Sequence, residues 1–186
     1  MSIDSKYCKA ALFSYFRFGK GISFIASECG LFSADMLLVT KKHKLVEIEI
    51  KISRADFRND FKKYKHENYH MTLDECIEKA GANTPYRKRQ AKEYFGYHPT
   101  QFYFAVPEEL QDYVTRYLEE RNSKYGVMVV LDSGLPHNRK LKWMQRVKVV
   151  KRAKRLHNDE VNEKVKNKIV ARMSSELSNL WQKAIK

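Results

Sequence analysis

A Glu-Ile-Lys triplet at residues 49–51 places two side chains of opposite charge at alternate positions of an otherwise apolar segment. Successive side chains of a β-strand point to opposite faces, so Glu47, Glu49 and Lys51 are expected to share one face. A strand at the surface can carry such a pattern without any chemistry. The carboxylates that precede this segment in the sequence favour a functional site instead.

Two further carboxylates are expected close to the triplet. Asp35 begins the preceding strand of a predicted hairpin, so its carboxylate can lie beside Glu49 across the strand pair. Glu28 comes shortly before it, at the end of the first predicted strand. Three carboxylates and the Lys51 ammonium would then converge near one edge of the sheet.

This combination suits phosphodiester hydrolysis with a bound divalent cation. Mg²⁺ prefers carboxylate, carbonyl and water oxygens and would offset the repulsion between Asp35 and Glu49. Mn²⁺ accepts the same ligands and is expected to substitute for it. A metal ion held there lowers the pKa of a coordinated water, while Lys51 orients that water or stabilises the charge that develops on the phosphate.

Hydrophobic periodicity predicts an α/β domain that would position these residues. Ser53 and Asp56 have the spacing of a helix capping box, and Thr72 and Glu75 repeat it. The first half of the chain is expected to contain a helix at 5–18, strands at 22–26, 34–40 and 45–52, with a hairpin turn at 41–44, and a helix at 53–64.

The second half is expected to alternate helices and strands and to end in a long amphipathic helix. Its apolar residues recur every four positions, so the helix should pack on the body or on a second copy of the chain, and a homodimer is one arrangement that follows. Trp143 and Trp181 are expected to be packing residues. The predicted elements are a helix at 72–81, an irregular basic and aromatic segment at 85–99, a strand at 102–106, a helix from 107, a strand at 127–131 and a helix at 158–186.

The ordered set of motifs resembles the core of the PD-(D/E)XK nuclease superfamily, whose members share a restriction-endonuclease-like fold. The set consists of a helix, a strand with Glu28, a strand with Ala34-Asp35, a strand with Glu49-Ile50-Lys51, a helix and a strand. The segments 49–57, 102–107 and 125–127, together with Asp60 and Lys63, resemble the MmcB-like DNA repair branch and related phage proteins. The likeness spans residues 10–134.

The resemblance implies a mixed central β-sheet flanked by helices and a defined set of roles for the site residues. Asp35 and Glu49 would bind the metal, with the Ile50 carbonyl as a further ligand. Lys51 would support catalysis and Glu28 would act as an accessory acid. Residues 1–136 would form the core, with a basic and aromatic insertion at 66–101, and residues 137–186 would form a basic extension packed on the same domain.

Positive charge is concentrated in that extension. The chain has 36 Lys and Arg against 22 Asp and Glu, and residues 137–186 hold 15 of the basic and 4 of the acidic side chains. Such a surplus attracts polyanions, and interleaved apolar residues favour a folded basic surface. The residues expected to contact DNA phosphates are Arg87, Lys88, Arg89, Lys92, Arg139, Lys140, Lys142, Arg146, Lys148, Lys151 and Arg152.

Two other groups of residues have alternative readings. Asp56 and Asp60 could form a second metal site, but a helix cap and contacts with basic neighbours explain them better. His66, His70, Cys76 and His98 do not match the spacing of an ordinary zinc finger, so scattered surface histidines are the preferred interpretation.

These observations predict a metal-dependent nuclease that acts on DNA. A catalytically silent DNA-binding repair scaffold with the same fold is the alternative, and an RNA-directed nuclease is a third reading because both backbones present the same phosphates. Three cysteines without CxxC spacing predict a reducing, cytoplasmic location. No apolar run approaches the length of a membrane span, so no membrane association is expected.

Overall fold

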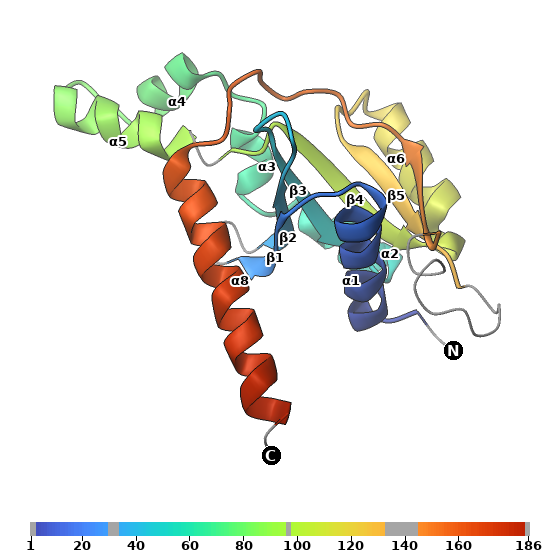
Figure 1. Ribbon diagram of the computed structural model, residues 1–186. Coiled ribbons are helices and arrows are strands. Elements are labelled where there is room, and N and C mark those ends of the chain that lie inside the picture. Colours follow the sequence, from blue (N-terminus) through green and yellow to red (C-terminus); the bar gives the residue numbers. More distant parts are fainter. Residues whose placement is uncertain (1–2, 30–33, 96–97, 133–144, 185–186) are drawn as a thin grey trace.

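Six strands form a mixed β-sheet in the computed structural model, which describes residues 3–29, 34–95, 98–132 and 145–184 (Figure 1). The strands lie in sequence order, and the central pairs β3–β4 and β4–β5 are parallel while the other pairs are antiparallel. This arrangement confirms the predicted α/β class. The strands are β1 (Phe24–Cys29), β2 (Ala34–Val39), β3 (Leu45–Ile50), β4 (Gln101–Pro107), β5 (Gly126–Val130) and β6 (Val147–Lys151).

The β2–β3 hairpin fixes the register on which the candidate site depends. Met36 pairs with Ile48 and Leu37 pairs with Glu47. Extended by one residue, this register places Asp35 opposite Glu49. The turn is closed by hydrogen bonds between Thr40 and Lys44, so the predicted hairpin is confirmed. Because β3 is the third of the six strands, the site lies within the sheet and not at its edge, which corrects the expectation from the sequence.

Helix α1 (Ser5–Ser14) covers one face of the sheet. The Asp4 side chain caps it by accepting a hydrogen bond from the Tyr7 amide, and the helix continues as a π-helical segment, Tyr15–Gly19. Its apolar side, which includes Leu12, packs on residues such as Met36 and Ile48 from the central strands.

Helices cover the opposite face in two groups, α2 (Arg54–Asp60) and α6 (Gln111–Glu120) over β4 and β5, and α8 (Glu163–Ala184) over β1 and β2. Phe57 of α2 lies against Phe104, with ring centroids 4.8 Å apart. The two apolar clusters leave the middle of this face to β3. There the charged side chains of Glu47 and Glu49 are covered by α3 (Lys65–Asn68).

Two expectations about local structure were wrong. The first strand runs from Phe24 to Cys29 and not over 22–26. The basic segment expected to be irregular contains helix α5 (Pro85–Phe95), next to α4 (Leu73–Lys79). Pro85 at the first helical position and the Thr84 hydroxyl, which accepts a hydrogen bond from the Arg87 amide, are start signals that account for it.

Among the described residues, the apolar side chains of helix α8 pack on the body as far as Met173, and beyond it the Glu176 carboxylate accepts hydrogen bonds from the amide and hydroxyl of Ser27. Val165 and Ile169 are buried against β1 and β2, whereas Leu177 and Trp181 are 56% and 64% exposed. Trp181 was expected to be a packing residue, but it does not pack on the body of this chain, and a homodimer through this helix stays a prediction. Trp143 lies outside the described residues. No helix in the described ranges is long and apolar enough to cross a membrane.

Candidate functional site

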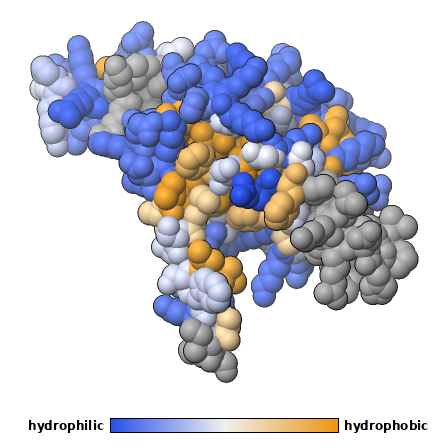
Figure 2. All heavy atoms as spheres, in the orientation of Figure 1, coloured by the Kyte–Doolittle hydropathy of each residue, from blue (hydrophilic) through white to orange (hydrophobic). Residues whose placement is uncertain are grey.

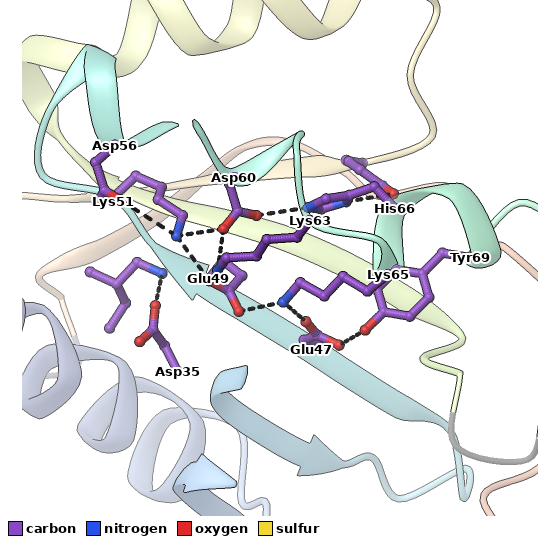
Figure 3. A network of polar contacts seen from close by, with 12 residues as sticks. Asp35, Glu47, Glu49, Lys51, Asp56, Asp60, Lys63, Lys65, His66 and Tyr69 are labelled. Atoms are coloured by element: carbon purple, nitrogen blue, oxygen red, sulfur yellow. Dashed lines mark hydrogen bonds and ion pairs between the residues drawn. The ribbon is translucent and has the colours of Figure 1, made fainter. Parts of the chain in front are cut away.

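Three lysine ammoniums surround the buried carboxylate of Glu49 (Figure 3). Lys51 lies 2.9 Å and Lys63 3.2 Å from Oε2, and Lys65 donates to Oε1 at 2.6 Å. Glu49 is 1% exposed, so the loss of water as a hydrogen-bond partner is offset by these three cations. The side chain of Lys51, the residue after β3, lies on the same face of the strand as that of Glu49, as the alternation in the sequence predicted.

Asp60 joins the same network from the end of α2. Its Oδ1 lies 2.7 Å from the Lys51 ammonium and 2.5 Å from that of Lys63, and its Oδ2 lies 2.8 Å from His66 Nε2. Nδ1 of His66 in turn lies 3.0 Å from the Tyr125 hydroxyl. The expected contacts of Asp60 with basic neighbours are thus confirmed, and Asp56 lies farther out, 3.9 Å from Lys51.

Glu47 forms the inner end of the network. Lys65 bridges it to Glu49, with 2.6 Å to each carboxylate, and the Tyr69 hydroxyl donates to Glu47 Oε2 at 2.5 Å. Burial raises the pKa of Glu47 to about 7 even though both partners favour its charged form. Glu47 is therefore a weaker acid than an ordinary glutamate.

Asp35 lies beside the network rather than inside it. Its Oδ2 accepts a hydrogen bond of 2.8 Å from the Ile50 amide, and no partner for Oδ1 is found in the part of the chain that the structure describes. Burial, followed by the negative charge of Glu49, raises the pKa of Asp35. Two carboxylates thus approach each other closely enough to disfavour their simultaneous ionisation.

Glu28 is placed differently from Asp35 and Glu49. It is the last residue but one of β1, has a left-handed backbone (φ 47°), is exposed, and pairs with Lys9 at 2.5 Å and Arg172 at 3.9 Å. The hydrogen bond from Lys9 lowers the pKa of Glu28. The charge of Lys9 also acts to lower the pKa of Asp35, although burial and Glu49 outweigh it.

The charge state of Lys51 is set by its neighbours. Burial acts to lower the pKa of Lys51, but Glu49 and Asp60 raise it well above the usual value. Asp60 shows the opposite balance: burial acts to raise its pKa, yet hydrogen bonds from His66, Lys51 and Lys63 hold it well below the usual range. Lys51 is consequently a permanent cation and Asp60 a permanent anion near neutral pH.

The donor set can be compared with the needs of a divalent cation. Within the described ranges, no group of three or more His, Cys, Asp or Glu side chains is arranged to hold a metal ion. Asp35 nevertheless fits such an ion, because one of its oxygens has no partner among the described residues and because burial and the charge of Glu49 disfavour its ionised form. A cation would bind Asp35, Glu49 and the Ile50 carbonyl, and it would share Glu49 with the lysines.

Several members of this network have only weak sequence signals. Lys63 and Lys65 follow β3 by more than a dozen residues, and only folding of α3 over the strand brings them to Glu49. His66 was read as a surface histidine but is buried between Asp60 and Tyr125. Asp60 and Lys63 are three residues apart, but α2 ends at Asp60 and α3 begins at Lys65, so no single helix places these residues together.

The structure places the expected DNA-contacting residues in three settings. Arg87, Lys88, Arg89, Lys148 and Arg152 are exposed. The Arg146 guanidinium donates to the Tyr7 hydroxyl at 2.7 Å, and the Lys151 ammonium donates to the carbonyls of Ser123 and Tyr125. Arg139, Lys140 and Lys142 lie outside the described residues, as does the side chain of Lys92.

The raised pKa of Glu47 predicts a pH effect on stability. Between about pH 4.5 and 7 the native state keeps a proton that the unfolded state has lost, so the free energy of unfolding falls as pH rises through this window. Glu47→Gln removes this term. As pH rises from 4.5 to 7, the free energy of unfolding of the wild type should therefore fall by up to about 3 kcal/mol relative to that of the variant. Urea unfolding of both proteins across this range measures the difference, and a difference independent of pH contradicts the assignment.

Comparison with known proteins gives one structural neighbour. No protein-family model matches the sequence, and no curated protein matches it significantly. The structure is similar to that of SPO1766, a protein of unknown function from Silicibacter pomeroyi, with 13% sequence identity and a TM-score of 0.55. The match covers 98% of this chain and 92% of that one, so the likeness extends over the whole fold.

Proposed function

We propose that this protein is a Mg²⁺-dependent nuclease with a restriction-endonuclease-like core of the PD-(D/E)XK type, closest to the MmcB-like branch, that hydrolyses phosphodiester bonds in DNA. The observation that carries the proposal is the pairing of Asp35 with Glu49. Their strands are in register, one oxygen of Asp35 has no partner among the described residues, and burial together with the negative charge of Glu49 raises the pKa of Asp35. A bound divalent cation would relieve that repulsion.

The roles of the residues follow from their positions. Asp35 and Glu49, with the Ile50 carbonyl, would hold Mg²⁺ or Mn²⁺, which supplies an activated water and neutralises phosphate charge. The hydrogen bond from the Ile50 amide fixes the orientation of the Asp35 carboxylate. Glu28 stays an accessory acid in this proposal, paired with Lys9, whose charge also acts on Asp35.

Lys51 would act as a positive charge rather than as a base. Its pKa is raised by Glu49 and Asp60, so its Nζ keeps its proton at neutral pH and cannot accept one from water. A fixed ammonium next to the metal ligands stabilises the negative charge that develops on a phosphate during hydrolysis. Asp60, at the end of α2, positions this ammonium through an ion pair of 2.7 Å.

One observation favours the alternative, a DNA-binding scaffold without turnover. Lys51, Lys63 and Lys65 together neutralise the Glu49 carboxylate, so its affinity for a metal ion is reduced by competition. In that case the basic surfaces would bind DNA while the network served to stabilise the fold.

Cleavage of end-labelled substrates separates the two candidates. Single-stranded, duplex, flapped and four-way-junction DNA, together with RNA, would be incubated with the protein in Mg²⁺ or Mn²⁺, with EDTA as the control. We expect DNA cleavage that requires the metal. Tight, salt-sensitive binding without cleavage of any substrate would contradict the nuclease and support the scaffold. Preferential cleavage of RNA would overturn the choice of DNA.

A further inference from the structure

A pocket of about 400 Å³ lies between α3, α4 and α5, outside the carboxylate network. Helices α4 and α5 lie side by side at one end of the molecule (Figure 1), where the visible surface is largely hydrophilic (Figure 2). The volume of the pocket falls within the range of small-molecule sites, roughly 300–1,000 Å³. Met71 and Cys76 contribute apolar surface, and Tyr64, Asn68, Lys79 and Arg87 contribute polar or aromatic groups.

Asn68 provides the most specific feature of this pocket. It is 4% exposed, and its amide nitrogen has no hydrogen-bond partner in the described part of the chain. The Lys79 ammonium donates to its Oδ1 at 3.3 Å, which fixes the amide orientation, because a flipped amide would set two donors against each other. A buried donor without a partner is costly, so a ligand that supplies an acceptor would gain binding energy there.

The remaining groups match the other parts of a nucleotide. The Tyr64 ring is 57% exposed and borders the pocket. The Lys79 ammonium lies over one face of this ring, 4.6 Å from its centroid, so a base would stack on the other face. Arg87 lines the same pocket, and none of the described residues pairs with its guanidinium. A guanidinium binds phosphate oxygens in a bidentate manner. The keto oxygens of pyrimidine bases are acceptors suited to the Asn68 amide.

The position of the pocket relates it to the carboxylate network. Tyr64 lies between Lys63 and Lys65, which both contact Glu49, and Asn68 precedes Tyr69, which contacts Glu47. One short segment thus presents some side chains to the network and others to the pocket. A nucleotide held in the pocket would have its neighbouring phosphates near the candidate metal site.

We propose that this pocket binds one unpaired nucleotide, through Asn68 to a base acceptor, Tyr64 to the base plane and Arg87 to the phosphate. The inference rests on the proposed function and narrows its substrate class to single-stranded or flapped strands, since a base inside a duplex cannot enter the pocket. The DNA or RNA origin of the strand is decided by the experiment.

Fluorescence anisotropy in EDTA tests the pocket without any cleavage. The probes are a labelled oligothymidylate, an oligouridylate, an abasic DNA strand and a duplex, all of the same length. The variants are Asn68→Leu, which removes the donor at similar volume, and Tyr64→Ala, at an exposed position. Asn68→Leu removes a buried donor that has no partner among the described residues, and it also removes the acceptor of the hydrogen bond from Lys79. Because the Lys79 ammonium is partly exposed and can bind water instead, the change in thermal unfolding should be small. Asn167→Leu and Phe18→Ala, at exposed positions outside the pocket, are the matched controls.

We expect wild-type protein to bind oligothymidylate more tightly than the abasic strand or the duplex. Each pocket variant should weaken oligothymidylate binding about tenfold and leave abasic binding unchanged, while the controls match the wild type. Equal binding of thymidylate and abasic strands, or wild-type affinity in both pocket variants, would contradict the proposal that the pocket binds a nucleotide. Tighter binding of oligouridylate would assign the strand to RNA. If the protein binds strands in a base-dependent manner but does not cleave them in Mg²⁺, the nuclease function is contradicted and the nucleotide-binding pocket is retained.

Discussion

Replacing Asp35 with asparagine is expected to lower Mg²⁺-dependent DNA cleavage at least about 100-fold. The substitution keeps the shape of the side chain and an oxygen that can accept the hydrogen bond from the Ile50 amide. It removes the negative charge that, with Glu49, would hold the metal ion. It also removes the repulsion that raises the pKa of Asp35, so the fold should be retained or slightly stabilised.

Single-turnover cleavage of the preferred DNA substrate measures this effect. Asp112→Asn, at an exposed position of α6, is the matched control and should cleave at the wild-type rate. Circular dichroism of each variant verifies the fold. Full metal-dependent cleavage by Asp35→Asn would contradict the assignment of Asp35 as a metal ligand.

Replacing Asp60 with asparagine is expected to destabilise the protein by about 3–5 kcal/mol. The buried Asp60 carboxylate lies against Lys51, Lys63 and His66, so its neutralisation leaves Lys51 buried with reduced compensation. The hydrogen bonds that hold its pKa low also predict that wild-type stability is lost when acid protonates this group, below the ordinary pKa of an aspartate.

Thermal unfolding gives the readout for Asp60→Asn, with an expected fall in Tm of about 10 °C for a chain of this size. Asp56→Asn is the matched control. Asp56 is about half exposed and lies 3.9 Å from the same Lys51, so its loss should cost less than about 1 kcal/mol. Equal effects of the two substitutions would show that the buried network contributes no more than a surface ion pair.

Local sequence patterns predicted the elements that carry the site. Alternation along β3 and the polar turn before it predicted the hairpin, and the hairpin register predicted Asp35 next to Glu49. The Ser53 cap and the Thr72–Glu75 capping box predicted the starts of α2 and α4. These signals were sufficient because each depends on residues only a few positions apart.

The missed features depend on contacts between distant segments. The convergence of Lys63 and Lys65 on Glu49 follows from packing of α3 over β3, which no local pattern specifies. The helix at Pro85 was missed because basic and aromatic composition was weighted above its start signals. Trp181 was misplaced because the apolar stripe of α8 continues beyond the part of the helix that meets the sheet.

Calorimetric titration with Mn²⁺, in wild-type protein and in Asp35→Asn, tests the central claim most directly. The claim is that Asp35 and Glu49 together hold a divalent cation although three lysines already neutralise Glu49. We predict one Mn²⁺ site in the wild type and an affinity at least about tenfold lower in Asp35→Asn. Absence of Mn²⁺ binding to the wild type, or equal affinity in the two proteins, would contradict it.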